Sequence, residues 1–131
     1  ELLMALRGLR DQRKMSVLLI AHHQIRKHQD PEMDQIDRYE IKLHSKASAL
    51  VQESCDMVLF CKHKNITKKE DTGFGNSRTR GIATGKRVMC TTETPSYVAK
   101  NRFNLPDELD LSWSALAAAL NPTPVTTQAK G

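Results

Sequence analysis

Hydrophobic positions fall into short blocks, some at helical spacing and some as uninterrupted apolar runs. Leu2, Leu6 and Leu9 recur on one helical face, which predicts an amphipathic helix over residues 1–14. Residues 16–22 follow at once as an apolar run without polar alternation. Such runs are typical of a strand buried on both faces of a parallel sheet. A helix joined closely to a buried strand predicts an α/β fold.

Later segments predict further strands and two short helices. Residues 57–61 and 86–92 are apolar enough for strands, and the polar, glycine-containing stretch between them (63–80) predicts a poorly ordered tip. The two strands should therefore form an antiparallel pair at one sheet edge. The remaining expected elements are a helix over 46–53 capped by Ser45, a strand at 97–100, a turn at 104–106, and a helix over 113–120 capped by Ser112 and packed through Leu109, Leu111, Trp113 and Leu116.

Composition adds a few limits. A chain of 131 residues with 39% hydrophobic residues has room for one domain with a modest core. No apolar run approaches the ~18–20 residues that span a bilayer, and no signal peptide is visible, so we expect a soluble intracellular protein. The first residue falls directly into a helical pattern, which suggests a start inside a domain. Three cysteines without a C-x-x-C pair indicate reduced thiols.

Charge is unevenly distributed around the net value of +5. Residues 42–102 contain twelve Lys or Arg and five Asp or Glu, whereas residues 29–40 contain five acids and one Arg. A basic second half suits a polyanion, either nucleic acid or the phosphates of a nucleotide. Solubility alone is the alternative explanation.

Residues 24–44 are long for a plain connection, which indicates a functional or disordered loop.

Two groups of polar residues are candidates for chemistry. Gln24 follows the expected buried strand, and ligands of open α/β sheets bind at the carboxyl ends of strands. Its amide can donate to a phosphate oxygen or orient a water, and its loop can respond to that phosphate. Lys100 and Arg102 lie two apart on an extended segment, so they point the same way and can meet a terminal phosphate. A solvated edge with two ordinary cations is the alternative.

Other chemistries receive less support. The five histidines and the acids of residues 30–40 would be compatible with a metal-dependent nuclease. Adjacent His22 and His23, however, point to opposite sides of a strand and rarely bind one ion, so no metal site is predicted. No G-x-S-x-G elbow is present. A phosphate-cradling G-x-x-x-x-G-K-[ST] loop is also missing, since the nearest run has Arg80 and Arg87 at two required positions.

Several motifs carry a family resemblance. His23-Gln24-Ile25-Arg26 resembles the Asn-Gln-Ile-Arg stretch of RecA recombinases, with His23 replacing the Asn. Lys100-Asn101-Arg102 resembles the Lys-x-Arg finger of hexameric replicative helicases and the paired lysines on the matching strand of RecA. From about residue 22 to 116 the chain is similar to phage ATP-binding proteins with a RecA-like core, including single-strand-annealing recombination factors. The matching residues are 22–25, 37–40, 42–44, 56–60, 87–89, 95, 99–103 and 105–106.

This resemblance implies a fold and a domain organisation. Residues 1–120 would be the C-terminal part of a RecA-like P-loop ATPase domain, with buried parallel strands and an antiparallel edge. Residues 121–131 would be a flexible tail. The phosphate-cradling loop and the magnesium-holding Asp would lie upstream of residue 1. Without those central strands the isolated chain would expose apolar edges, so we expect it to be marginally stable or prone to aggregation.

The resemblance also implies site residues. Gln24 would sense the γ-phosphate, and Arg102, with Lys100 beside it, would reach the nucleotide of the neighbouring subunit. These three residues are the predicted catalytic set, and His23 joins them in contacting the nucleotide. The loop over 25–44 would contact single-stranded DNA. The DNA contacts are assigned to Arg26, Lys27, Arg38 and Lys42.

The leading functional hypothesis is therefore part of a phage RecA-like ATPase that acts on single-stranded DNA in recombination or replication, in the cytoplasm of a bacterial host. The full-length protein would bind ATP and Mg²⁺ and assemble into a ring or filament with its missing N-terminal half in place. The chain alone would be inactive. The alternatives are a non-catalytic basic DNA-binding or annealing module and, third, a metal-dependent nuclease.

Overall fold

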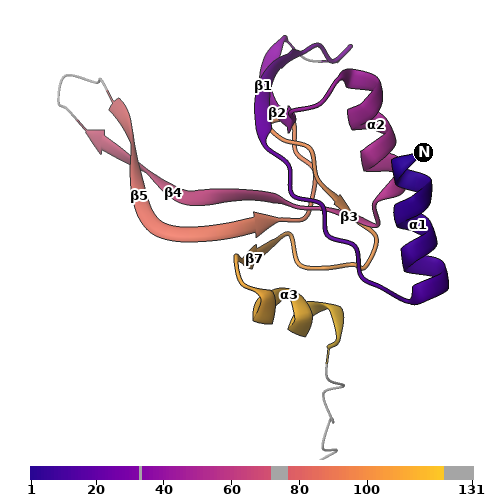
Figure 1. Ribbon diagram of the computed structural model, residues 1–131. Helices are drawn as coiled ribbons and strands as arrows, with labels where there is room; N and C mark the ends of the chain where they lie inside the picture. Colours follow the sequence, from indigo (N-terminus) through magenta and orange to yellow (C-terminus); the bar gives the residue numbers. More distant parts are fainter. Residues whose placement is uncertain (33, 72–76, 123–131) are drawn as a thin grey trace, which may run out of the picture.

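The fold is α/β, and the described residues form three helices and several antiparallel sheets (Figure 1). The computed structural model describes residues 1–32, 34–71 and 77–122. Strands β1 and β2 pair with each other, β3 pairs with β6, and β4, β5 and β7 form a third sheet. The elements in chain order are α1 (Leu2–Arg13), β1 (His23–His28), β2 (Ile36–Ile41), α2 (Ser45–Ser54), β3 (Met57–Val58), β4 (Phe60–Asp71), β5 (Ser77–Cys90), β6 (Lys100–Asn101), β7 (Glu108–Asp110) and α3 (Trp113–Leu120).

The predicted buried strand over residues 16–22 is wrong for this structure. These residues have no strand pairing, and Leu18 and Ile20 are 75% and 92% exposed. A strand buried on both faces needs neighbours that satisfy its backbone groups, and none of the described strands pairs with this segment. The pairs between the named strands are antiparallel, and the described residues add one isolated parallel bridge, Tyr39 with Tyr97, so the expected parallel core is not among them.

The expected loop over residues 24–44 is instead a β-hairpin. Strands β1 and β2 pair in register from His23 opposite Ile41 to His28 opposite Ile36. The free edge of β2 is extended by residues 96–98, because the Tyr39 amide donates to the Ser96 carbonyl at 2.8 Å and the Val98 amide to the Tyr39 carbonyl at 3.2 Å. The prediction failed because residues 24–44 are mostly polar, whereas the strands they form have one half-buried face.

The core lies where β5, the turn after β6, and α3 meet. Met89, Leu105 and Leu116 are buried there, and partly buried side chains such as Leu109 pack around them. Val88 and Thr91 are fully buried, and the Thr91 hydroxyl donates to the Pro106 carbonyl at 2.6 Å, so its burial leaves no unmet donor.

Helix α3 begins as predicted. The Ser112 side-chain oxygen accepts a hydrogen bond from the Ala115 amide at 3.1 Å, which satisfies one of the free amides of the first turn. Leu116 is buried as expected, but Trp113 is 71% exposed, so its predicted role in the core is wrong. The predicted tail over residues 121–131 lies mostly outside the described residues, which end at Pro122.

Helices α1 and α2 lie close to their predicted positions. Helix α1 contains no buried residue: Leu2 is 71% exposed and Leu9 is 41% exposed, despite their helical spacing. Helix α2 starts one residue earlier than expected, and its N-cap is His44, with no side-chain cap, rather than Ser45. None of the described helices is long and apolar enough to cross a membrane.

The predicted antiparallel pair at residues 57–92 is confirmed in the third sheet and is much longer than expected. Strands β4 and β5 pair from Phe60 opposite Cys90 out to Asp71 opposite Ser77, so the predicted poorly ordered stretch is largely strand. Residues 72–76 of that stretch lie outside the described residues. We name this paired ribbon the β4–β5 arm, and Figure 1 shows it projecting away from the rest of the fold.

A bulge bends the β4–β5 arm near its base. The register shifts between His63 and Asn65, where β5 contains extra residues around Gly85. Gly85 has a φ of 71°, in the left-handed region that side chains with a Cβ rarely adopt. The Thr84 hydroxyl donates to the Lys64 carbonyl and so holds the two strands together at the bulge.

All three cysteines are free thiols, as the sequence indicated. Cys90 is buried, Cys55 is intermediate and Cys61 is exposed.

Replacing Gly85 with alanine should reduce the stability of the strand pairing in the arm by about 1–2 kcal/mol. The cost comes from placing a residue with a Cβ in the left-handed region of backbone conformation, and not from a steric clash. A Cβ at Gly85 would meet nothing within 4 Å. Hydrogen exchange of the arm amides should accelerate roughly 5–30-fold. Gly81→Ala is the matched control, since Gly81 is equally open and lacks a positive φ. Equal exchange in the two variants would contradict the assignment.

Candidate functional site

Lys100 binds the C-terminal end of helix α2. Its Nζ donates to the Gln52 carbonyl at 2.7 Å and to the Glu53 carbonyl at 3.1 Å. The last carbonyls of a helix lack intrahelical partners and carry partial negative charge, so an ammonium group is favoured there. The short β3–β6 pairing, with Val58 opposite Lys100, holds the lysine at this position.

Arg102 reaches the same region through Asp56, which follows Cys55, the C-cap residue of α2. Arg102 Nη1 lies 3.2 Å from Asp56 Oδ1, and Arg10 Nη1 lies 3.2 Å from Asp56 Oδ2. One carboxylate therefore bridges helix α1 and the end of β6. Arg10 also pairs with Asp11 at 2.8 Å, and hydrogen bonding to Asp11 raises the pKa of Arg10.

The two predicted phosphate-binding cations thus share one rim, which consists of the end of α2, Asp56 and β6. They differ in availability. Lys100 is half-buried and holds two carbonyls, whereas the Arg102 side chain is 54% exposed and makes a surface ion pair. Surface ion pairs contribute about 0–1 kcal/mol, so Arg102 can exchange Asp56 for a stronger anion at little cost.

Gln24 lies at the other end of α2. It belongs to β1 rather than to the end of a buried strand, so the predicted setting is corrected, while the role itself stays a prediction. Its Nε2 donates to the Ile41 carbonyl at 3.2 Å and to the Leu43 carbonyl at 3.4 Å, just before α2 begins. A ten-residue helix is about 15 Å long, so α2 separates Gln24 from the Lys100 rim.

His23, the fourth predicted nucleotide contact, belongs to an aromatic cluster. Its ring packs edge-on against Tyr39 at 5.2 Å and against Phe60 at 6.3 Å, and Phe60 stacks on Tyr97 at 4.7 Å. Burial raises the pKa of Tyr97. The cluster joins the β1–β2 hairpin to the base of the β4–β5 arm.

The predicted DNA contacts are distributed over the β1–β2 hairpin and its end. Arg26 donates to the Leu43 carbonyl at 3.1 Å, and its guanidinium is 3.9 Å from Glu40. Lys27 and Lys42 are exposed, and Lys27 lies opposite Asp37 in the strand register. Two of these cations therefore stand beside acids of the same hairpin.

Arg38, the remaining predicted DNA contact, is largely enclosed. Its side chain is 12% exposed, Nη2 pairs with Glu93, and Nη1 lies 3.5 Å from His28 Nε2. Its Nε is buried and has no hydrogen-bond partner. An arginine held in this way orders residues 93–98 beside the hairpin, and it has little surface left for a phosphate.

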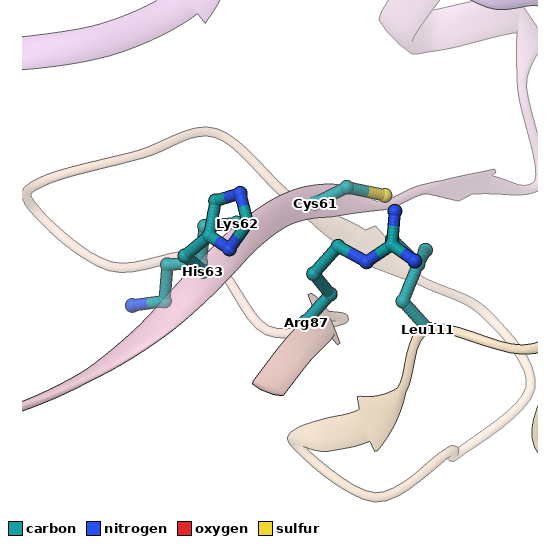
Figure 2. Close-up of a pocket in the computed structure, with 5 residues that line it drawn as sticks. All are labelled: Cys61, Lys62, His63, Arg87 and Leu111. Carbon is teal, nitrogen blue, oxygen red and sulfur yellow. The ribbon is translucent and has the colours of Figure 1, made fainter. Parts of the chain in front are cut away.

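A shallow notch opens at the base of the β4–β5 arm (Figure 2). Its volume is about 100 Å³, and its lining residues are Cys61, Lys62, His63, Arg87 and Leu111. Cys61 is exposed as a residue, but desolvation of its thiol by the surrounding side chains raises the pKa of Cys61, which disfavours the thiolate. Within the described residues, no group of three or more His, Cys, Asp or Glu side chains could hold a metal ion.

Sequence reasoning missed Asp56 as a bridge and Glu93 as the partner of Arg38. Each partner lies 46 or more residues away along the chain, so no local spacing signals the pairing. The only available signal was the position of Asp56 between a helix end and a strand, where a carboxylate can meet cations from neighbouring segments.

Replacing Lys100 with methionine should cost about 1–2 kcal/mol of unfolding free energy, because two charge-assisted hydrogen bonds at the end of α2 are lost. Arg102→Met should cost less than about 1 kcal/mol, because only a surface ion pair is lost. Urea unfolding followed by circular dichroism measures both variants. A larger loss for Arg102→Met would contradict the division of roles between the two cations.

Comparison with known proteins identifies the family. A family model described as an AAA domain matches residues 1–103, which include α1, the β1–β2 hairpin, the β4–β5 arm and the Lys100–Arg102 segment. No curated protein and no solved structure matches the chain. Because the family model covers more than half of its length, the chain belongs to the AAA-domain family of P-loop-type, nucleotide-binding ATPases.

Proposed function

We propose that this chain supplies the phosphate sensor and the trans-acting cations of a RecA-like phage ATPase that works on single-stranded DNA. The nucleotide would lie between subunits of a ring or filament. Its phosphates would be cradled by a loop outside these 131 residues, since no G-x-x-x-x-G-K-[ST] run occurs here. The family match supports the ATPase class, and the remaining steps are inferences from the residues.

One observation carries the proposal: Lys100 and Arg102 converge on a single rim at the end of α2. Phosphoryl transfer needs little covalent chemistry from the protein and much electrostatic stabilisation of the transferring group. A guanidinium that is half exposed and that pairs with a surface carboxylate, Asp56, suits that task. Lys100, fixed by two backbone carbonyls, would set the position of the rim.

The residues fit the terminal phosphate of ATP in charge and donor type. Guanidinium and ammonium groups are strong donors to phosphate oxygens. The family resemblance implies that the magnesium-holding Asp belongs to the same part of the protein as the phosphate-cradling loop. When bound, Mg²⁺ would offset phosphate charge, while Arg102 would do so from the neighbouring subunit.

Gln24 would serve the nucleotide on the opposite side of the same subunit. Its amide now binds the Ile41 and Leu43 carbonyls, which lie next to the start of α2. If the Gln24 amide donated to a γ-phosphate instead, its hydrogen bonds to these carbonyls would be lost, and the β1–β2 hairpin would be less tightly attached to α2. This is how Gln24 would couple nucleotide state to the hairpin, where the exposed Lys27 and Lys42 are the proposed DNA contacts.

Arg102→Ala is the direct test, in the intact protein that contains both this chain and a phosphate-cradling loop. Steady-state ATP hydrolysis should fall about 10³-fold or more, while binding of a non-hydrolysable ATP analogue should remain, because the finger acts on the transition state.

Arg10→Ala is the matched control, because Arg10 binds the other oxygen of Asp56 and has no proposed contact with nucleotide. Its hydrolysis rate should stay within about twofold of the parent rate, which is the difference expected of a surface substitution. Persistent hydrolysis in Arg102→Ala, or equal losses in both variants, would remove the finger assignment.

A further inference from the structure

The β4–β5 arm contains the excess positive charge of the chain. Residues 60–90 include eight Lys or Arg and two Asp or Glu, whereas the remainder includes twelve Lys or Arg and thirteen Asp or Glu. The arm is therefore strongly basic, and the rest of the protein is close to neutral. Basic charge gathered on one element is the usual electrostatic mark of a polyanion site.

The arm is also the most extended element of the fold. A strand of twelve residues is about 40 Å long, and β4 forms one side of the ribbon over that length. Strand β7 pairs only with residues 88–90 at its base. Beyond that point the described arm has no third strand, and Figure 1 shows it reaching away from the helices. A two-stranded ribbon of this kind fits the major groove of a duplex.

Cations at the base of the arm are accessible. Lys62, Lys86 and Arg87 are exposed, with Lys62 Nζ 5.1 Å from the Tyr97 ring centre. Arg87 and His63 are cross-strand partners, and both line the notch shown in Figure 2. Lys64 is engaged instead with Glu108, whose hydrogen bond raises the pKa of the lysine.

Further cations occupy positions toward the tip. The backbone register puts Lys68 opposite Arg80 and Glu70 opposite Arg78. Positive residues therefore occur at intervals along much of the ribbon. This spacing suits a partner whose negative charges repeat along its length, as the phosphates of a nucleic acid do.

The composition of the arm favours phosphates over bases. Residues 60–90 contain two aromatic residues: Phe60, whose ring is stacked on Tyr97 in the aromatic cluster, and Phe74, which lies outside the described residues; the remaining positions contain no Phe, Tyr or Trp. Proteins that bind single strands through their bases use such rings as stacking platforms. We propose that the β4–β5 arm binds the phosphate backbone of nucleic acid without sequence preference, with Lys62, Lys86 and Arg87 as contacts at its base.

This inference deepens the proposed function by moving the main DNA contact from the β1–β2 hairpin to the arm. Residues 23–41 of the hairpin contain three Lys or Arg and five Asp or Glu, so that hairpin repels phosphates overall. Two of its arginines are engaged internally, Arg26 with Leu43 and Glu40, and Arg38 with Glu93. The arm has neither limitation at Lys86 or Arg87.

The test measures nucleic-acid affinity of the chain without nucleotide. Fluorescence anisotropy would be recorded with a labelled single-stranded oligonucleotide and with its duplex, each over a series of salt concentrations. The arm variant combines Lys62→Gln, Lys86→Gln and Arg87→Gln. The matched control combines Arg7→Gln, Arg13→Gln and Lys46→Gln, which removes the same charge from exposed positions on α1 and α2.

The arm variant should lose about tenfold or more in affinity, and its salt slope should fall by about 1 for each phosphate contact removed. The control should keep the parent slope. Tighter binding of the duplex than of the single strand would place the ribbon in a groove, and equal binding would indicate contact with the backbone alone.

A second readout locates the contact. Cys61 is exposed beside Arg87, so bound oligonucleotide should slow its alkylation, whereas alkylation of Cys55 should not change. Circular dichroism would verify that each variant is folded.

Three results would overturn the proposal: no binding by the parent chain, equal losses in the arm and control variants, or unchanged alkylation of Cys61. In those cases the arm cations would serve only to keep an exposed strand edge from pairing with other chains. Because no hydrolysis is measured, such a failure leaves the Arg102 assignment to be judged on its own test.

Discussion

The unpaired carbonyls at the end of helix α2 are the constraint on which the candidate site depends. A helix end needs partners for these groups, and Lys100 provides an ammonium group to two of them. The β3–β6 pairing holds Lys100 at this position, and Arg102, two residues further on, contacts Asp56, which also contacts Arg10 of α1. Three segments distant in sequence therefore meet at one rim because a helix ends there.

Helix α2 also separates two kinds of contact. At its start, Gln24 and Arg26 bind the Leu43 carbonyl and tie the β1–β2 hairpin to the helix. At its end lies the Lys100 rim. Under the proposed function, α2 would lie between two nucleotide contacts, with Gln24 at its start and Arg102 at its end. The β4–β5 arm is attached at a third point, through the aromatic cluster of Phe60 and Tyr97.

Local signals in the sequence predicted the elements that local interactions determine. The Ser112 cap, helices α1 and α2, and the antiparallel pairing of β4 and β5 follow from spacing, capping and turn composition. The failures share a cause. Residues 16–22 have the apolar pattern of a buried strand, but no strand pairs with them. Trp113 is a residue type that is usually buried, but no core surrounds it here. The β1–β2 hairpin has a polar sequence that does not resemble a pair of strands. Long-range pairs such as Arg38 with Glu93 leave no periodic trace.

The central claim is that Arg102 acts on the nucleotide of a neighbouring subunit, and mixing subunits tests it most directly. One set of subunits of the intact protein would carry Arg102→Ala, and the other would carry a disabled phosphate-cradling loop, so each alone should be inactive. In an equal mixture, roughly a quarter of head-to-tail interfaces would join an intact loop to an intact Arg102. The account predicts that ATP hydrolysis reappears on mixing. A mixture as inactive as its parts would contradict it.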